Sequence, residues 1–438
     1  MASGHRIPPA PAALLAASAA LFAPAPVFAF EYSLPYTFKT QPRLSEPGRA
    51  DTGWYFAASA VNGTFPRTST MMREGGFSDL ILDPSDASGR TFWTVQDRGL
   101  AVNYDAAGAG DTSFRVFAFP GHHQKFVRIR VSGDSVETLA RDSIGGLDTG
   151  FVTGLPSARV ATGEIALRMR LDSARVNASA AWRVPPSQNG YDFEAIARAP
   201  DGTLYLADEM GPRIVRVHAA TRRIDREWSP GDGLPLVLAR RRDNRGLEAM
   251  CRTPSGHLAG LMQGGLYNTA SGKRSNARDS TRVLRFLLLN PATGALREHV
   301  YLADLKGGNR LPGEVKVGAM ACLGDSAFLV LEHGKDREGH HWIDLHRVTL
   351  TPQTSDVHEA NDMTGNGRMF QGGLKTLEQV GYIPGDSAAL ASVGVTPLRK
   401  QLVLGDVIGR TPWRHESPEG LALVNDSVVA ILSDNDYA

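Results

Sequence analysis

The sequence predicts an all-β protein with a β-propeller fold of six or seven blades and loop insertions. A unit of two short apolar strands joined by a tight turn recurs along the chain. The 46 Gly and 26 Pro residues indicate many turns. Propellers arrange repeated hairpins around a central channel, so this combination favours that fold. Residues 30–438, at roughly 60 to 70 residues per blade against about 45 in a minimal blade, give the blade count.

Three segments are expected to lie outside the regular hairpins. The two main insertions should be 269–281, rich in Ser, Lys, Arg and Asn, and 354–373, rich in Asn, Asp and Gly. The last unit supplies only two strands, so we expect an N-terminal segment, Tyr55 to Val61, to complete the final blade and close the ring.

The first 29 residues resemble an export signal. His5 and Arg6 precede an apolar stretch from Ala10 to Phe22, and Val27-Phe28-Ala29 fits the small-x-small cleavage pattern. The alternative is a buried first helix, which the several Pro residues disfavour. We therefore expect a signal peptide at 1–29 and a mature single-domain protein, 30–438, in the periplasm or secreted.

The two cysteines, Cys251 and Cys322, have two open interpretations. In an oxidising compartment they could form a disulfide. Two buried free thiols are the equally open alternative.

Charge and composition exclude several classes of protein. The 47 Lys and Arg residues nearly balance 46 Asp and Glu residues, giving a net charge of +1. A dedicated nucleic-acid binder would be more basic. After the signal, no apolar run reaches the roughly 18 residues that a membrane-spanning helix needs. We expect a small-molecule partner, no nucleic acid and no membrane span, and we leave the oligomeric state open.

The repeated hairpins place acidic residues in pairs. In chain order, the copies start at Phe77, Tyr191, Gly246, Val317 and Pro418. Turns such as Asp201-Gly202 and Ser255-Gly256 separate the two strands, because Gly accepts the positive φ of a tight hairpin. A two-residue turn fixes the register. It predicts the opposite pairs Glu194 and Glu209, Glu248 and Gln263, and Glu419 and Asp434.

Acids at the open ends of several hairpins predict a cation-binding rim. Like charges across a strand pair are destabilising, and buried carboxylates cannot all ionise without a compensating cation or proton. Ca²⁺ prefers several converging oxygen ligands. The alternative is that each acid lies singly in solvent or caps a backbone group. The candidate metal ligands are Asp79, Glu194, Asp208, Glu209, Glu248, Glu332, Glu419 and Asp434.

Basic residues follow several of these acids, notably Arg98, Arg213 and Lys335. Beside a metal they would orient an anionic group while its charge develops during hydrolysis. One rim acid would act as general base, and we expect Glu194 and Glu248 to be catalytic. Ordinary surface ion pairing is the alternative.

Familiar catalytic motifs are absent from the sequence. There is no G-x-S-x-G nucleophile elbow, no H-E-x-x-H, no P-loop and no dinucleotide fingerprint after a strand. The group Glu338, His340, His341, Asp344 and His346 lacks a convincing ligand spacing, so we expect loop histidines there. These absences disfavour serine hydrolases of the α/β type, zincins, kinases and dehydrogenases.

Several stretches resemble the "esterase-like activity of phytase" family of exported bacterial proteins. They are 192–197 (DFEAIA) with Asp201-Gly202, 207–212 (ADEMGP), 419–423 (EGLAL) and 433–437 (SDNDY). The similarity runs from about Gly75 onward. It implies a phytase-like propeller domain with esterase or phosphoesterase-like activity and calcium as the cation. The sequence departs from the acidic repeat at Gln263 and Ala319.

The sequence as a whole predicts an exported, metal-dependent hydrolase that acts on phosphoesters or small esters, with an anionic ester as substrate. Two alternatives remain open. One is a lactonase-like propeller, which would also use a metal ion bound at the channel. The other is a non-enzymatic propeller that binds a ligand or protein and uses metal for stability.

Overall fold

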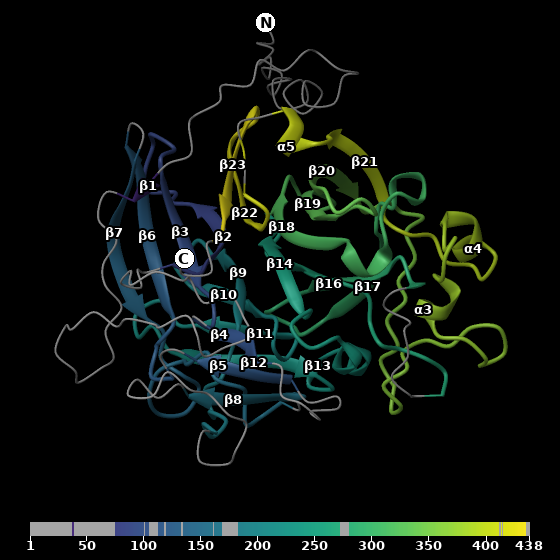
Figure 1. Ribbon diagram of the computed structural model, residues 1–438, viewed down its shortest axis with the longest axis horizontal. Helices are drawn as coiled ribbons and strands as arrows, with labels where there is room; N and C mark the ends of the chain where they lie inside the picture. The colour runs from purple at the N-terminus through teal and green to yellow at the C-terminus, as the bar shows by residue number, and fades with distance from the viewer. Residues whose placement is uncertain are drawn as a thin grey trace, which may run out of the picture.

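A computed structural model describes residues 37–38, 75–99, 101–104, 113–117, 120–132, 135–160, 162–168, 183–271, 280–410, 413 and 415–434. The predicted signal peptide and the segment Tyr55 to Val61 lie outside these residues. Within them the chain is dominated by β-strands, as the sequence predicted, and the sheets are arranged radially around a centre (Figure 1).

Five sheets form the blades of a β-propeller, numbered here in chain order. Blade 1 contains β2 (Phe77–Leu82), β3 (Thr91–Gln96), β6 (Lys125–Ser132) and β7 (Ser135–Ser143), with β1 (Thr37–Phe38) at its outer edge. Blade 2 contains β9 (Phe193–Arg198), β10 (Leu204–Asp208), β11 (Arg213–Val217), β12 (Ile224–Pro230) and β13 (Gly233–Leu234). Blade 3 contains β14 (Leu247–Arg252), β15 (Leu258–Met262), β16 (Val283–Leu289) and β17 (Leu296–Leu302).

The last two blades follow the same order from the centre outward. Blade 4 contains β18 (Lys316–Cys322), β19 (Ala327–Lys335), β20 (His341–Thr349) and β21 (Arg399–Leu404). Blade 5 contains β22 (Pro418–Asn425) and β23 (Val428–Ser433). The helical segments are short: α3 (Leu377–Val380), α4 (Ser387–Ala391), α5 (Val407–Arg410), and the 3₁₀ turns η2 (Leu236–Arg240), η3 (Lys306–Gly308) and η4 (Pro312–Glu314).

The five inner strands form a closed ring. Contacts run from β2 to β9, β14, β18 and β22, and β22 contacts β2 again. An apolar cluster also lies between each successive pair of blades, including blades 5 and 1, where Leu80 and Phe92 pack with Ala422. Burial of each large apolar side chain contributes about 1.5–3 kcal/mol. The described ring therefore has five blades, which differs from the predicted six or seven.

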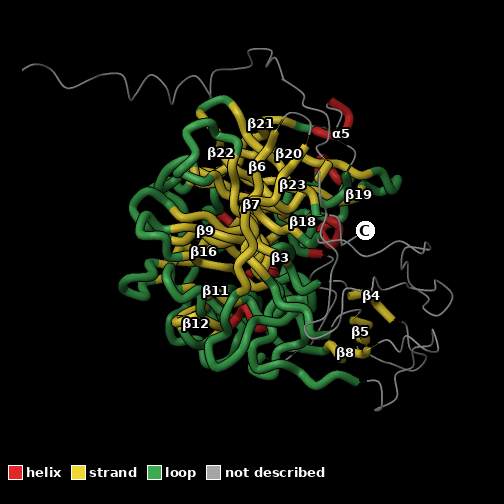
Figure 2. The backbone as a smooth tube through the Cα atoms, turned by 90° about the vertical axis from the view of Figure 1, so that its left-hand side faces the viewer, coloured by secondary structure: helices red, strands yellow, loops and turns green. Residues whose placement is uncertain are grey.

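Insertions account for the extra length of the chain. A small sheet of β4 (Ala101–Tyr104), β5 (Ser113–Phe117) and β8 (Glu164–Arg168) stands beside the ring (Figure 2). The predicted insertion 354–373 contains no strand, and it continues into α3 and α4. Phe370, Leu377 and Leu390 of this segment pack against Val283 and Val300 on the outer side of blade 3.

Every inner strand contains a β-bulge at the same place. The register shifts by one residue at Asp79 and Leu80 in β2, and at single residues in the other four strands. The bulged residues are Asp79, Glu194, Glu248, Gly318 and Glu419. Such a bulge inserts one unpaired residue and redirects the side chains beyond it.

The predicted hairpin register is wrong for two physical reasons. Ala199 donates its N–H to Thr203 O at 2.8 Å and accepts the N–H of Gly202 at 3.0 Å, so the second hairpin has a three-residue turn with Gly202 at a φ of 89°. This turn shifts the register by one residue, and the bulge shifts it by another. Glu209 therefore donates its N–H to Asp192 O at 2.8 Å and lies opposite Asp192 instead of Glu194.

Cys251 and Cys322 form a disulfide between the inner strands β14 and β18. The bond therefore joins neighbouring blades 3 and 4 across 71 residues of sequence. This settles the alternative that the sequence left open. No helix among the described residues is long and apolar enough to cross a membrane.

Candidate metal centre

Two sets of equivalent positions meet at one end of the central channel, which we call the mouth. The first set is the bulged residues of the inner strands. The second set lies at the mouth end of the second strand of each blade, and consists of Gln96, Glu209, Gln263, His333 and Asp434. His333 lies within β19, which continues to Lys335. Both sets recur once per blade because the hairpin repeats once per blade.

Three carboxylates of blade 2 form the core of the cluster. Asp192 precedes β9, Glu194 is the bulged residue of β9, and Glu209 follows β10. One ligand oxygen from each lies within 4.8 Å of the others, and all three residues are buried. The sequence brought Glu194 and Glu209 together correctly, but through a different register, and it missed Asp192.

Glu248, the bulged residue of β14, adds a fourth carboxylate from blade 3. Its charge acts on both Glu194 and Glu209. Glu248 Oε2 and Glu209 Oε1 are buried and have no hydrogen-bond partner. Gln263 Oε1 at the adjoining strand end is likewise buried without a partner.

His333 contributes a fourth unpartnered acceptor from blade 4. Its Nδ1 lies 3.2 Å from the carbonyl oxygen of Glu416, which can only accept, so Nδ1 carries the hydrogen. Nε2 is then a lone-pair acceptor, and it is buried without a partner. Burial, followed by the charge of Lys316, lowers the pKa of His333 to about 3, so the ring is neutral at physiological pH.

The pKa values of the carboxyls reflect the shortage of positive charge. Burial, followed by repulsion from neighbouring acids, raises the pKa of Glu194 and of Glu209 well above the ordinary value. Burial also raises the pKa of Glu248 to about 7, although a hydrogen bond from Gln263 and the charge of Lys316 oppose it. Full ionisation of this group requires a cation that the chain itself does not supply.

Positive groups stand on two sides of the cluster. Arg98 donates its backbone N–H to Asp192 Oδ1 at 3.1 Å, and its Nη1 lies 3.3 Å from Asp192 Oδ2. Its guanidinium is also held by Glu164 of β8. Arg245 and Lys316 lie on the other side, where their charges act on Glu248. Neither forms an ion pair with a described residue.

Asp79 has a different environment from the other bulged acids. Its carboxylate accepts the N–H of Leu80 at 2.7 Å and that of Ile196 in blade 2 at 2.8 Å. Leu421 of blade 5 also donates a backbone hydrogen bond to it. Asp79 thus ties three blades together around the channel, with its backbone at a φ of 57°. These hydrogen bonds occupy both oxygens of a residue predicted to bind metal.

Asp208 and Arg213 form a buried pair inside blade 2. Asp208 Oδ2 lies 2.6 Å from Arg213 Nε, and both side chains are fully buried. Asp208 also accepts the N–H groups of Asp192 and Gly211, while Arg213 donates to Gly190 O and stacks over a tyrosine ring. A substrate would have to displace these contacts to reach Arg213. The geometry favours a structural role for both residues.

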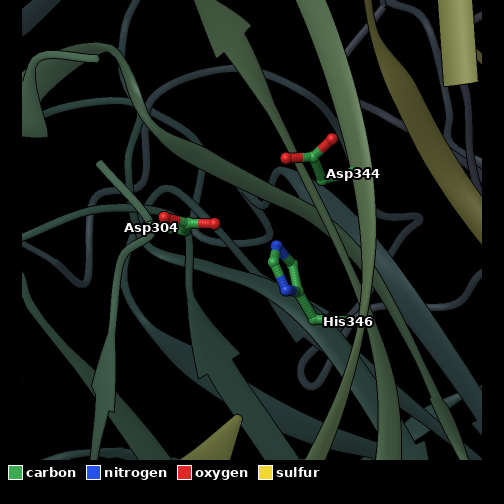
Figure 3. A group of neighbouring side chains, drawn as sticks. All are labelled: Asp304, Asp344 and His346. Carbon is green, nitrogen blue, oxygen red and sulfur yellow. The ribbon is translucent and has the colours of Figure 1, made fainter. Parts of the chain in front are cut away.

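Glu332 lies in a second polar cluster, between blades 3 and 4. It accepts hydrogen bonds from Tyr301 at 2.8 Å and Lys400 at 2.5 Å. His346 Nε2 is 3.2 Å away. Asp304, Asp344 and His346 surround the same space (Figure 3). Arg310 pairs with Asp344 at 2.7 Å, so chain cations already compensate these acids.

The remaining predicted residues lie at the edge of the mouth or beyond it. Glu419 is half-buried in the bulge of β22, and its charge acts on Glu194. Asp434 follows β23 and donates its N–H to Ser417 O at 3.2 Å. Lys335 ends β19 opposite His341 and is exposed. The structure does not bring Lys335 to the cluster.

Sequence reasoning missed Asp192, Arg245, Lys316 and His333. Asp192 and Arg245 each lie two or three residues from a predicted ligand, but the assumed register directed attention to other positions. His333 and Lys316 are paired across β18 and β19 in blade 4. Aligning the five hairpins position by position would have found His333, because it occupies the place of Glu209 and Gln263.

The closed ring of radial sheets and the acidic mouth define a β-propeller with a candidate cation site. The chain belongs to the phytase-like family described as esterase-like activity of phytase, whose family model matches residues 73–437. The resemblance that the sequence indicated is therefore confirmed.

Solved structures give weaker likenesses. Hydrazine synthase from Kuenenia stuttgartiensis has a TM-score of 0.33 and 9% identity, covering 85% of this chain and 99% of that one. Streptogramin B lyase has a TM-score of 0.28 and 10% identity, covering 82% and 91%. A putative glucose dehydrogenase from Thermus thermophilus has a TM-score of 0.27 and 12% identity, covering 83% and 79%. Scores this low carry no argument about activity. No curated protein matches the chain.

Proposed function

We propose that the protein is an exported, metal-dependent hydrolase of phosphoesters or small esters, with its active site at the mouth of the propeller. One observation carries the proposal. Four buried acceptor atoms from blades 2, 3 and 4 have no donor among the described residues: Glu209 Oε1, Glu248 Oε2, Gln263 Oε1 and His333 Nε2. A buried acceptor left unsatisfied costs about 1–3 kcal/mol, so this group fits a missing cation with its bound waters.

Asp192, Glu194 and Glu209 would hold the cation, with Glu248 beside them. The three ligand side chains offer only oxygen atoms, which favours Ca²⁺ over a soft transition metal. When bound, the cation would polarise the ester and lower the pKa of a coordinated water.

Glu248 is suited to accept the proton of the attacking water. Without a cation, burial raises its pKa to about 7, and a cation beside it would lower that pKa and leave the carboxylate ionised, ready to accept a proton. Its unpartnered Oε2 is free to receive that proton. Glu194 accepts a hydrogen bond from Ser78 Oγ at 2.7 Å, so its position is fixed and it serves the cation.

Arg245 and Lys316 would bind the anionic group of the substrate. Both lie beside Glu248 without an ion-pair partner among the described residues. Arg98 is committed to Asp192 and Glu164, so it would orient a metal ligand instead of touching substrate. An anionic ester would therefore lie with its charge toward blades 3 and 4 and its reacting atom toward blade 2.

Two observations support export. The apolar stretch and cleavage pattern at the start of the chain are typical of a signal peptide. The disulfide between Cys251 and Cys322 would persist in an oxidising compartment such as the periplasm.

The test is hydrolysis of p-nitrophenyl phosphate, bis-p-nitrophenyl phosphate, p-nitrophenyl acetate and phytate by the mature protein, with Ca²⁺ and with a chelator. We expect chelator-sensitive turnover on one class, lost by about 10²-fold or more in Glu248→Gln. Glu137→Gln, on the outer strand of blade 1, is the matched control. Turnover unchanged by both chelator and Glu248→Gln would contradict the proposal.

Two further readouts separate the alternatives. Lactones assayed in parallel would reveal a lactonase-like propeller, since that activity would share the metal dependence. A binding propeller with a structural metal would show no turnover on any substrate, while chelation would still lower its melting temperature.

A further inference from the structure

The opposite end of the central channel holds a separate cavity of about 440 Å³. All five inner strands line it. The lining residues nearest the bulges lie one or two positions beyond the bulged residues and are Leu80, Ile196, Met250, Met320 and Leu421. The carboxylate of Asp79, bonded to Ile196 N and Leu421 N, lies between this cavity and the acidic mouth. The two ends of the channel are therefore chemically distinct sites.

The lining of this cavity carries charge at two places, Arg198 and Arg252. They occupy equivalent positions at the ends of β9 and β14, opposite Leu204 and Leu258. Both are half-buried, and their guanidinium groups lie beside the turn residues Gly202 and Gly256. The two arginines are thus neighbours on adjacent blades at the open rim of an apolar cavity.

Neither arginine forms an ion pair with a described acid, although the charge of Asp201 acts on Arg252. Asp201 is close enough to Arg252 to influence it, but the N–H of Thr203 donates to the Asp201 carboxylate at 2.9 Å. The rim therefore presents two positive groups with donors to spare.

We propose that this end of the channel binds a linear aliphatic carboxylate, a medium-chain fatty acid, with its chain inside the cavity and its carboxylate on Arg198 and Arg252. Guanidinium groups match carboxylates in bidentate geometry, and the interior is lined by Leu, Ile, Met and Ala. The volume lies within the range of about 300–1,000 Å³ typical of ligand pockets.

The shape and charge of the cavity decide between ligand classes. Its lining is longest in blade 2, from Ile196 to Pro200, where four steps of roughly 3.3 Å give about 13 Å. Blades 3, 4 and 5 each contribute three consecutive residues. An extended chain fits that depth, whereas a compact polyanion would leave most of its charges against apolar walls. A cationic amphiphile would meet like charge at the rim. This binding requires neither metal nor hydrolysis, so it does not depend on the proposed function.

The test is calorimetric titration of the mature protein with decanoate, decanol and decyltrimethylammonium, each below its micelle concentration. We expect one decanoate per chain, bound at least ten-fold tighter than either of the other two probes. Equal affinity for all three probes, or no saturable decanoate binding, would overturn the proposal.

Variants locate the site. Arg198→Gln combined with Arg252→Gln should weaken decanoate at least ten-fold and leave decanol binding unchanged. Arg226→Gln, an exposed arginine over Trp228 on the outer part of blade 2, is the matched control. Glu209→Gln at the mouth should also leave decanoate affinity unchanged. Undiminished binding in the double variant, or its loss in Glu209→Gln, would place the ligand elsewhere and refute the inference.

Discussion

The protein buries two groups of acids and treats them in opposite ways. Between blades 3 and 4, Glu332 forms an ion pair with Lys400 and accepts a hydrogen bond from Tyr301, and Asp344 forms an ion pair with Arg310. Lys400, followed by His346, holds the pKa of Glu332 well below its usual range despite complete burial. At the mouth, the pKa values of Glu194, Glu209 and Glu248 are raised instead.

The difference between the groups is a matter of counterions. Asp208 and Glu332 hold equivalent strand positions, and each is neutralised by a cation of the chain, Arg213 or Lys400. Glu209 is one residue further along, so its side chain alternates to the other face. There, Asp192 pairs with Arg98, but no ion pair among the described residues includes Glu194, Glu209 or Glu248. Burial of acids is thus common in this fold, and the missing cation is peculiar to the mouth.

The largest expected effect comes from removing a counterion that the chain does supply. Lys400→Met leaves Glu332 buried beside Tyr301 and His346 without its cation. Breaking a buried pair in this way costs about 3–5 kcal/mol, so the free energy of unfolding in urea should fall by that amount. Lys335→Met, exposed at the end of the same sheet, should change it by less than about 0.5 kcal/mol. Equal losses of unfolding free energy in the two variants would contradict the conclusion that Lys400 neutralises Glu332.

The metal-free protein should lose stability as pH rises. Glu248 has a folded pKa of about 7 against an ordinary value of 4.5, so the folded state binds the proton more tightly. Its stabilisation is complete below pH 4.5 and is lost as pH rises through 7, by up to about 3 kcal/mol. Chemical denaturation between about pH 5 and 8 with chelator measures this loss, and Glu248→Gln should reduce it, leaving the part that comes from Glu194 and Glu209. A flat wild-type profile would show that the mouth is already compensated.

Calcium should replace the missing counterion. At a concentration about 100-fold above its dissociation constant, a ligand that binds only the folded state adds about 2.7 kcal/mol. The melting temperature should therefore rise with Ca²⁺ in the wild type and stay constant in Glu209→Gln. Lys400→Met should retain the full rise from its lower starting point. A rise that survives in Glu209→Gln would locate the cation outside the mouth.

The smallest expected effect is a gain in the free energy of unfolding. Without metal, Glu209→Gln removes one of several repelling charges, and Gln already occupies the equivalent positions 96 and 263. The unfolding free energy should increase by about 0.2–1 kcal/mol at about pH 8, measured by urea denaturation with chelator. A loss of several kcal/mol would mean that Glu209 is paired as Glu332 is.

Five hairpins were visible in the sequence, and the structure contains five inner strands among its described residues. The blade count still differed, because dividing the length by an average repeat left too little of the chain for insertions. The insertion 354–373 was predicted, but the small sheet that contains Arg115 and Glu164 was not. Recognising a turn from Asp201-Gly202 was sound. Its length and the bulge at Glu194 depend on packing around the channel, which local sequence does not encode.

The candidate site was also predictable only in part: the sequence shows the acids but not what surrounds each of them. Acids one strand position apart have opposite surroundings, which explains why Glu209 lies at the mouth while Asp208 joins Arg213 inside the blade. The cationic partner of Glu332 is Lys400, which lies 68 residues later in the sequence. Only the folded arrangement of β17, β19 and β21 shows that this acid is already compensated.

The bulge of blade 4 makes the mouth asymmetric, because it holds a glycine where the other four blades hold an acid. A Cβ on Gly318 would lie 2.0 Å from Pro418 O, so no acid can stand there, and the imidazole of His333 lies over the glycine instead. The fivefold repeat of the backbone therefore carries a side-chain pattern with no rotational symmetry. Blades 1, 2, 3 and 5 each carry a bulged acid, while blade 4 presents Lys316 and His333 instead. A bound molecule with chemically different ends therefore has one favourable orientation about the propeller axis, although the backbone repeat alone would give five equivalent orientations.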